Sequence, residues 1–540
     1  MISSIPPLAT NDPSAGPGLP ASKEVGALAG AVSLHLQGRR EEALEALQSQ
    51  PVEAIPLPET HFARGRICYE LGRYEEAVTG FERFLAIYPN HKPARFNLAL
   101  CLQYISRWEE AEAQFRAVLD ADEGHRGARQ GLGISLLHQQ KFHNALEVFE
   151  QLCLDEADES ALFGRAVALQ LLSEMDAAVQ AYQRVLEVNP AAREALINLI
   201  TLHRQCKNTG GLKACCERLL ALDQNSEAAL EGLATAAFWE GDYRGCAGHC
   251  ERLIEAHAES FERWSNLGLA WQKAGELDKS AEAYERAAAL RPDAAESHSS
   301  LGLVHQQLGR LEEARHNLEQ ALELTPDSAD LLLNLGYVHE QQQQWEEAET
   351  VYRKLTAAHA ENAEGWFRLG YACLRRNNHG AAAEAFAACV QLSPGWREAR
   401  INLGLAHHKA GDRDAAKRVL GDLLAAEPGS TDALRGLAAI ALDEGNDEEA
   451  LRLHQQLADA GERTADVLYN LALLSQKSGR LEDAERLYRE SLAQRAEFAE
   501  ALLNLGHTLS AQGRDAEARE SWLEAIRVKP ELAAGYFLAE

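Results

Sequence analysis

The sequence predicts an all-α fold, an α-solenoid of about fifteen helix-turn-helix repeats, on three observations. A pattern of residues recurs with a period of 34 along nearly the whole chain. Within each period, apolar or small residues fall three and four apart on both sides of a short break, as in two amphipathic helices joined by a turn. One small residue also recurs in each of the two helices. Such a repeat predicts one array with a continuous core, in place of the several globular domains that 540 residues would otherwise suggest.

The repeat is clearest between Ser260 and Pro292. Its landmarks are Leu267-Gly268 in the first helix, Gly275 at the turn, Ser280 and Tyr284 in the second helix, and Pro292 at the end. They return 34 residues later as Leu301-Gly302, Gly309, Ala314, Leu318 and Pro326, and then as Leu335-Gly336, Ala348 and Tyr352. The order of small, aromatic and proline positions is therefore kept from one copy to the next.

The small residues mark where the two helices of each hairpin cross. In the second helix they or their equivalents are Ala43, Ala77, Ala111, Ala145, Ala178, Leu212, Cys246, Ser280, Ala314, Ala348, Ala382, Ala416, Ala450, Ala484 and Ala518. The matching first-helix position is Gly or Ala in fourteen of the fifteen repeats, with Ile200 as the exception. A larger side chain at the crossing would hold the two backbones apart.

A helix-turn-helix period of 34 residues with these landmarks resembles the tetratricopeptide-repeat (TPR) family, and the resemblance covers nearly all of the chain. The resemblance implies a right-handed superhelix whose first helices line a concave groove. It also implies that partners bind in this groove as extended peptides. The expected function is that of a protein–protein interaction scaffold or adaptor.

The ends of the array and one internal repeat depart from the pattern. Residues 1–22 hold five prolines among small polar residues and predict a disordered tail. The array is expected over residues 23–530, with a weak, capping first repeat. The irregular repeat at about 193–226 carries Ile200 and Leu212 at the crossing and Thr209-Gly210-Gly211 between its helices, which favours a bend or soft joint. Residues 531–540 predict a short closing helix.

Asparagine recurs in the first helix two residues before the crossing position. The column comprises Asn97, Asn198, Asn266, Asn334, Asn402, Asn470 and Asn504, with Ser300 and Arg368 in two of the gaps. An asparagine amide can pair with the N–H and the C=O of one peptide unit together. The column is similar to that in the TPR portion of O-linked N-acetylglucosamine transferases, which implies that it grips polypeptide backbones. The alternative is that asparagine only helps to hold the hairpins together.

Other residues of the first helices are candidates for contact with a partner. Arg368 with the aromatic residues Tyr337, Phe367 and Tyr371 is expected to contribute to the groove. An acid recurs four residues before the asparagine position, as Glu262, Glu296, Asp330, Glu364, Glu398, Asp432, Asp466 and Glu500. This column could select basic partners, but a carboxylate in the first turn of a helix is also favoured by the helix dipole. The second interpretation is preferred.

Two groups of metal-ligating residue types are interpreted as core. Cys206, Cys215, Cys216, Cys246, His249 and Cys250 are of types that bind zinc. However, Cys216, Cys246 and Cys250 stand where other repeats place apolar core residues. His305, His339, Cys373 and His407 occur once per repeat, and helices about 8–10 Å apart cannot bring all four to one ion. No metal or cofactor is therefore predicted.

Composition excludes several classes of function. The formal net charge is −29, which opposes binding to nucleic acid or anionic membranes and favours basic or neutral polypeptide partners. No apolar run is long enough to span a membrane, and the N-terminus lacks the features of a secretory signal. Ten cysteines without a disulfide-type spacing fit the cytoplasm. The sequence shows no nucleotide-binding glycine loop, zinc-protease motif or nucleophile elbow, so no enzyme is predicted.

Two questions of function stay open at this level. One alternative to a free-standing scaffold is a substrate-recognition arm that works with a separate catalytic chain, such as a glycosyltransferase. The uncovered ends of the array could also support self-association.

Overall fold

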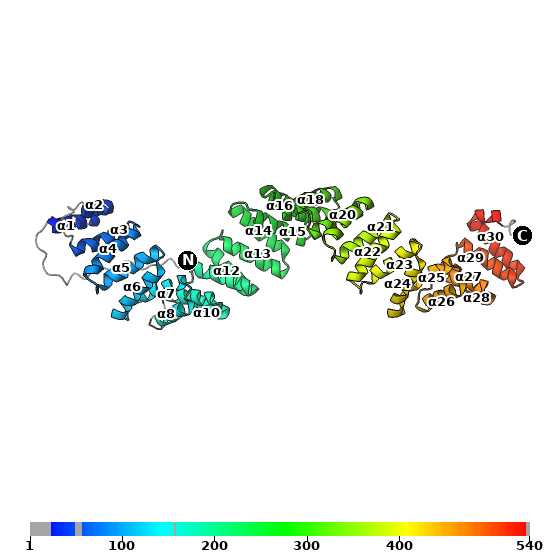
Figure 1. Cartoon of the computed structure of the whole chain (residues 1–540), viewed down its shortest axis with the longest axis horizontal. Coiled ribbons are helices and arrows are strands. Elements are labelled where there is room, and N and C mark those ends of the chain that lie inside the picture. Colours follow the sequence, from blue (N-terminus) through cyan, green and yellow to red (C-terminus); the bar gives the residue numbers. More distant parts are fainter. Residues whose placement is uncertain (1–22, 49–56, 156–157, 536–540) are drawn as a thin grey trace. The chain divides into compact units, whose positions relative to one another are not determined.

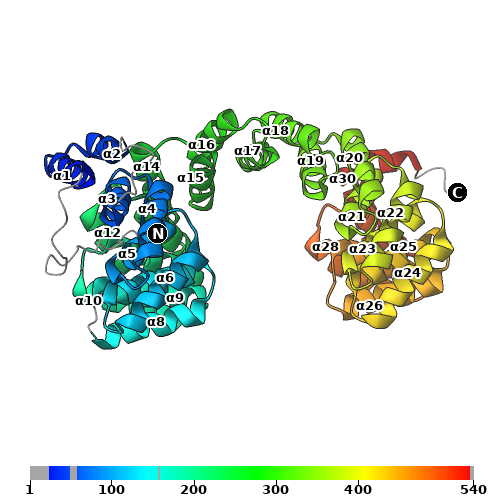
Figure 2. The ribbon, with the colours of Figure 1, turned by 60° about the vertical axis from the view of Figure 1, so that its left-hand side comes forward.

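The computed structural model describes residues 23–48, 57–155 and 158–535, and in these ranges the chain is entirely helical, with no strand. The predicted N-terminal tail, residues 1–22, lies outside the described residues. The chain divides into two compact units, residues 1–259 and 260–540. Figures 1 and 2 show the hairpins following one another along the chain in each unit. None of the described helices is long and apolar enough to cross a membrane.

In its described residues, the first unit contains seven helical hairpins. Its helices are α1(Lys23–Leu36), α2(Arg40–Gln48), α3(Pro58–Glu70), α4(Tyr74–Ile87), α5(Lys92–Tyr104), α6(Trp108–Ala121), α7(Arg126–His138), α8(Phe142–Asp155), α9(Glu159–Leu171), α10(Met175–Val188), α11(Arg193–Gln205), α12(Thr209–Leu222), α13(Glu227–Glu240) and α14(Tyr243–Ala256). The two helices of each hairpin pack together, and the second helix of each hairpin packs against the first helix of the next one in the unit.

The second unit contains eight hairpins over its described part, residues 260–535. Its helices are α15(Phe261–Lys273), α16(Leu277–Leu290), α17(Ala295–Gln307), α18(Leu311–Leu324), α19(Ala329–Gln341), α20(Trp345–Ala358), α21(Ala363–Arg375), α22(His379–Leu392), α23(Arg397–Lys409), α24(Arg413–Ala426), α25(Thr431–Asp443), α26(Asp447–Asp459), α27(Ala465–Lys477), α28(Leu481–Gln494), α29(Ala499–Ala511) and α30(Asp515–Val528). A final 3₁₀ helix, η1(Pro530–Gly535), packs on α30 where a closing helix was expected. The predicted all-α solenoid of about fifteen helix-turn-helix repeats is confirmed.

At the crossing positions, small residues of one helix pack against large side chains of the other. Ala77, Ala111 and Ala145 are completely buried. At the partner position in the first helix, a Cβ atom added to Gly336 would lie 2.4 Å from Tyr352 Cε1. The glycine therefore makes room for the aromatic ring of its own second helix, and the ring fills the space that a side chain would occupy.

Every hairpin turn contains one residue with positive φ. In nine of the fifteen turns this residue is glycine, as at Gly275; in the other six it is Ser106, Gln140, Ser173, Lys207, Gln343 or Asn377. A left-handed residue suits glycine because other residues pay a steric cost there. The turn geometry is thus kept even where the sequence does not offer glycine.

The irregular sixth repeat is packed like its neighbours at the crossing. Ile200 and Leu212 are both buried. The expectation that Gly210 and Gly211 lie between the helices is wrong, because α12 begins at Thr209 and takes both glycines into its first turn. The Asn208 side chain accepts a hydrogen bond from the Gly211 N–H at 3.0 Å and so caps the helix. The division between the two units falls after α14, at the end of the seventh repeat.

The crossing makes a testable prediction for stability. Gly336→Ala should destabilise the second unit by about 1–3 kcal/mol, because the new Cβ forces Tyr352 out of its position. The matched control is Gly421→Ala in α24, where an added Cβ meets nothing within 4 Å. That change should be neutral or stabilising by up to about 1 kcal/mol, since alanine favours helix over glycine. Urea unfolding followed by circular dichroism measures both, and equal midpoints for the two variants would contradict the prediction.

Candidate peptide-binding face

The first helices of the second unit carry a column of large apolar side chains. In the first five repeats of the unit, the residues directly after the crossing position are Leu269, Leu303, Tyr337, Tyr371 and Leu405. Tyr337 and Leu405 are each 40% exposed, and the other three are half-buried. Leu269 and Leu405 were not among the sequence candidates, although they share the register of Tyr337. We refer to these five residues as the apolar column.

The residues of the predicted asparagine column differ in their hydrogen bonds and in their burial. Asn198 donates to the Tyr182 hydroxyl at 2.9 Å, Asn470 to His454 Nε2 at 3.2 Å, and Asn504 to the Tyr469 hydroxyl at 3.1 Å. Asn97 is fully buried. Three remaining members, Asn266, Asn334 and Asn402, are exposed or half-buried, and their amides make no hydrogen bond within the described part of the chain.

The residue sixteen positions earlier accounts for much of this difference. It belongs to the second helix of the preceding repeat. It is Tyr182 before Asn198 and His454 before Asn470, which both accept a hydrogen bond. Before Asn266, Asn334 and Asn402 the corresponding residues are Cys250, Leu318 and Phe386. Asparagine therefore joins successive repeats by a hydrogen bond at some positions, and at others its amide stays available for a partner.

His454 shows how the engaged asparagines are fixed. Burial lowers the pKa of His454 against the opposing effect of its hydrogen bond to the Ala450 carbonyl, so the ring is neutral at pH 7. Its Nδ1–H donates to that carbonyl at 2.8 Å, which leaves Nε2 to accept from Asn470. Asn470 thus completes a buried polar pair between α26 and α27, in agreement with the structural alternative for the ladder.

Arg368 occupies the position of the asparagine column in α21, but its guanidinium group already forms ion pairs within the protein. Its Nε donates to Glu364 at 2.8 Å, and Nη1 lies 3.4 Å from Glu340 Oε2. Glu340 also accepts from the Tyr352 hydroxyl at 2.8 Å. The guanidinium lies 5.4 Å from the centre of the Tyr337 ring. Two carboxylates and an aromatic face therefore hold Arg368 beside the apolar column.

The two remaining aromatic candidates differ in what covers them. Phe367 stacks on Trp396, at the start of the next repeat, with ring centres 4.6 Å apart. It also meets Phe386 of its own hairpin edge-on, so rings cover it from two directions. Tyr371 makes one edge contact, to Trp345 at 5.8 Å, and is half-buried. Tyr371 consequently belongs with the apolar column, whereas Phe367 packs between repeats.

Five of the eight first-turn acids, Asp432 with Arg435 among them, form ion pairs within their own hairpins. Asp466 binds Arg495 at 2.7 Å and Glu500 binds Lys529 at 2.7 Å, in both cases joining the start and the end of one hairpin. Glu262 pairs with Arg291 in the same way, and Glu364 pairs with Arg368. These contacts support the preferred interpretation, in which the acids serve their own hairpins.

A small pocket opens on the first-helix face of the first unit. It has a volume of about 270 Å³ and is lined by Leu137, His138, Phe163, Val167, Gln170, Leu171, Tyr182 and Asn198. Its walls come from α7, α9, α10 and α11. We call it the Phe163 pocket.

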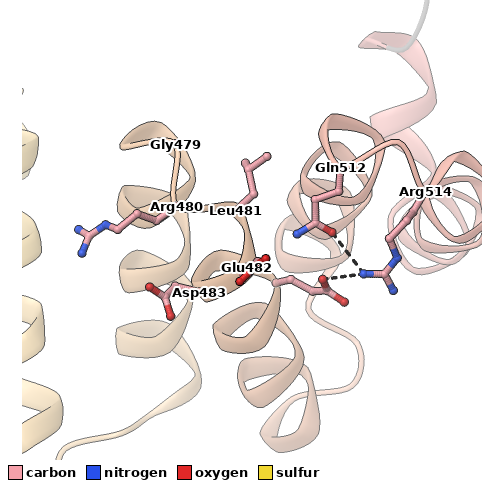
Figure 3. Close-up of a pocket in the computed structure, with 8 residues that line it drawn as sticks. Gly479, Arg480, Leu481, Glu482, Asp483, Gln512 and Arg514 are labelled. Atoms are coloured by element: carbon pink, nitrogen blue, oxygen red, sulfur yellow. Dashed lines mark hydrogen bonds and ion pairs between the residues drawn. The ribbon is translucent and has the colours of Figure 1, made fainter.

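A larger hollow of about 740 Å³ lies at the turn ends of the hairpins α27–α28 and α29–α30 and is lined largely by charged residues. Figure 3 shows Arg514 beside Gln512 at one side of it. The Arg514 guanidinium binds Glu485 at 2.7 Å, so the hollow's main cation is already paired.

Most members of the cysteine and histidine groups lie in the core, but Cys206 is exposed and His249 is half-buried. Cys216, Cys246 and Cys250 are buried, and so are His305, His339 and Cys373, whereas His407 is half-buried. The contact with the Cys246 thiol, together with burial, raises the pKa of Cys250, which therefore stays protonated. Among the described residues, no cluster of three or more His, Cys, Asp or Glu side chains could hold a metal ion.

Comparison with protein families identifies the repeat. Models described as "Tetratricopeptide repeat" match residues 58–91, 96–161, 132–196, 299–358, 340–395, 401–465 and 475–530, and one described as "TPR repeat" matches 268–309. Together they cover well over half of the chain. A comparison with curated proteins found no match.

Several solved structures are similar. One is the C-terminal part of a TPR repeat-containing protein from Cytophaga hutchinsonii, with 14% identity over 45% of this chain and 99% of that chain and a TM-score of 0.41. YrrB, described as a TPR protein with an unusual peptide-binding site, has 23% identity over 35% and 97%, with a TM-score of 0.32. Cut9–Hcn1 of the APC/C has 14% identity over 88% and 94%, with a TM-score of 0.30. Nothing about binding follows for this chain from such TM-scores.

The network around Arg368 predicts a pH dependence. Burial raises the pKa of Glu340, although the Tyr352 hydrogen bond and the charge of Arg368 oppose this. A carboxyl group whose pKa is raised by folding favours the folded state most when it is protonated. Its contribution to the free energy of unfolding is therefore full at acidic pH and is lost as the pH rises through the folded-state pKa. Glu340→Gln should therefore be at least as stable as the wild type at pH 7.5, with a smaller advantage at pH 4. Glutamine already accepts from tyrosine at the equivalent contacts Gln170–Tyr182 and Gln476–Tyr488.

Glu349→Gln is the matched control with the opposite sign. Burial alone would raise the pKa of Glu349, but hydrogen bonds from Arg353 and Arg376 bring it below the usual value. Its contribution to stability is present at neutral pH and is lost as the pH falls through the folded-state pKa. The control should be less stable than the wild type at pH 7.5. Urea unfolding at both pH values measures the two variants, and a loss of stability in Glu340→Gln at pH 7.5 would refute the assignment.

Proposed function

The chain belongs to the tetratricopeptide-repeat family, and on that premise we propose that it is a protein–protein interaction scaffold or adaptor that binds extended polypeptide segments along its first-helix face. The surface proposed for this role is the apolar column of the second unit together with Asn266, Asn334 and Asn402. Recognition is the chain's whole contribution in this proposal, without catalysis and without a metal or cofactor.

The proposal rests on asparagine side chains that make no hydrogen bond within the described part of the chain and that lie beside apolar side chains of the apolar column. The two residues hold the same relative positions in each of these repeats. Asn334 precedes Tyr337 by three residues, and Asn402 precedes Leu405 in the same way. Residues three apart on a helix are neighbours on its surface. A partner can therefore place a side chain against the apolar column while its backbone pairs with an amide. The same pairing recurs in Asn266 and Leu269.

The chemistry of the partner follows from charge. At a formal net charge of −29, the chain attracts basic segments and repels acidic ones at long range. Arg368 adds little to a clamp for acidic groups because Glu340 and Glu364 already hold it. The proposed partners are therefore basic or neutral polypeptides. All ten cysteines are free thiols, which supports a cytoplasmic location.

The test begins by selecting ligands for the full-length protein from a random phage-displayed peptide library. For the enriched peptides, Leu405→Arg should weaken binding about tenfold or more, because a charge would be buried against the peptide. Leu392→Arg is the control: Leu392 is 42% exposed, close to the 40% of Leu405, but lies at the end of the second helix α22. Fluorescence anisotropy with labelled peptides gives both values of Kd.

The asparagines are tested as two sets. Changing Asn266, Asn334 and Asn402 to Ala should weaken peptide binding by about tenfold or more, since each lost hydrogen bond is worth about 0.5–1.5 kcal/mol, and should leave the urea midpoint near that of the wild type. Changing Asn198, Asn470 and Asn504 to Ala should lower the midpoint instead, because their repeat-joining hydrogen bonds are lost. Peptides that bind all these variants with wild-type affinity would show that the first-helix face of the second unit is not the binding surface.

A further inference from the structure

The Phe163 pocket has the size and the lining of a receptor for a side chain. Its walls are Leu137, Phe163, Val167 and Leu171, with Leu171 46% exposed at the mouth. At about 270 Å³ the pocket is smaller than the roughly 300–1,000 Å³ typical of small-molecule sites. An aliphatic side chain is the occupant that this volume and this lining suit.

The floor of the pocket is polar and only partly satisfied. The Tyr182 hydroxyl donates to Gln170 Oε1 at 2.7 Å and accepts from Asn198 Nδ2 at 2.9 Å. Within the described residues, this leaves the Gln170 amide N–H groups and the Asn198 carbonyl oxygen without partners. These atoms can donate to and accept from one peptide backbone unit. The pocket thus offers an apolar wall for a side chain and a polar floor for the main chain that carries it.

The chain itself contains a segment that matches this site. Ile2, Ile5 and Leu8 recur at every third position, and Pro6 and Pro7 lie between the last two. Proline favours the polyproline II conformation, which has three residues per turn and a rise of about 3.1 Å per residue. The three apolar side chains would then share one face at intervals of about 9 Å. Packed helices lie about 8–10 Å apart, and α7 contacts α9 directly.

Charge and reach also fit. The first ten residues carry no ionisable side chain, so the acidic array does not repel them through side-chain charge. The only ionisable side chains lining the pocket are those of His138 and Tyr182, and the His138 ring stacks on Trp108 at 4.0 Å. From Leu8 to the start of α1 at Lys23 the chain has fifteen residue steps, which span at most about 50 Å. Four repeats separate α1 from α9, or about 40 Å at 10 Å per repeat.

We propose that the N-terminal segment of this chain, through Ile2, Ile5 and Leu8, occupies the Phe163 pocket and the adjoining first-helix face of the same molecule. The segment is an internal ligand that a partner must displace to bind this surface. The proposal rests on the proposed function in one respect, that first-helix faces bind extended polypeptide. It concerns a different surface, so the two can fail separately.

The experiment uses the full-length protein and a synthetic peptide of residues 1–12 with a fluorophore at its C-terminus. A tail variant, Ile2→Ser with Ile5→Ser and Leu8→Ser, should bind the peptide at least about fivefold more tightly than the wild type, because the wild-type segment competes at the high effective concentration of a tethered ligand. Equal affinities, or no binding to the tail variant, would overturn the proposal.

The pocket is tested in the background of the tail variant. Adding Leu171→Arg should reduce peptide affinity about tenfold or more, whereas adding Leu154→Arg should not change it. Leu154 is 83% exposed in α8 and does not line the pocket, so both changes place arginine at an exposed leucine of the same unit. No effect of Leu171→Arg would assign the peptide to another surface and refute the proposal.

Sedimentation velocity separates binding within one molecule from binding to a second copy. The wild type and the tail variant should both be monomers over the concentration range used. A wild-type dimer that dissociates in the tail variant would overturn the intramolecular arrangement in favour of exchange between chains. The Leu405→Arg variant provides the last distinction: it should bind the residue 1–12 peptide as the wild type does, whatever its effect on the library peptides.

Discussion

The close crossing of two helices once per hairpin is the constraint on which the rest of this structure depends. In fourteen of the fifteen hairpins the first helix presents Gly or Ala at that point. A side chain of the partner helix can then fill the space, as Tyr352 does over Gly336. The crossing fixes the rotation of each first helix about its own axis. Once this rotation is fixed, the residue two before the crossing and the residue directly after it fall at the same place in every repeat. The asparagine and apolar columns are therefore consequences of packing before they are features of a binding surface.

Much of the fold could be predicted from the sequence because its determinants are local. A 34-residue period, the small residues at the crossing and the turn at Gly275 all act within one hairpin, and repeats contact mainly their neighbours. The glycines of the sixth repeat were misplaced for an equally local reason. Asn208 caps α12, and Gly210 and Gly211 therefore lie within the helix. The two adjacent glycines suggested a loop, so the capping residue before them was not recognised as the start of a helix.

The candidate site was harder to predict because its members look alike in the sequence. Asn198 and Asn334 hold the same register, yet Asn198 is bound to Tyr182, whereas the residue sixteen positions before Asn334 is Leu318, whose side chain has no hydrogen-bond acceptor. The difference depends on a residue in the preceding repeat, sixteen positions away, so an alignment of single repeats hides it. Arg368 shows the same limit: its charge looked available for a partner, but Glu340 and Glu364 pair with it from two different helices.

Because each repeat of the first-helix face contributes little binding free energy, a peptide ligand must contact several repeats. Burying one leucine or tyrosine of the apolar column is worth about 1.5–3 kcal/mol at most, whereas micromolar affinity needs about 8 kcal/mol plus the cost of ordering the peptide. Several successive repeats must therefore be engaged, which favours extended segments with apolar residues at the spacing of the repeats. A tethered segment escapes part of this condition, because its effective concentration compensates for few contacts. Three apolar residues near the N-terminus can compete on such a face with a longer partner, and a partner that contacts more repeats can still displace them.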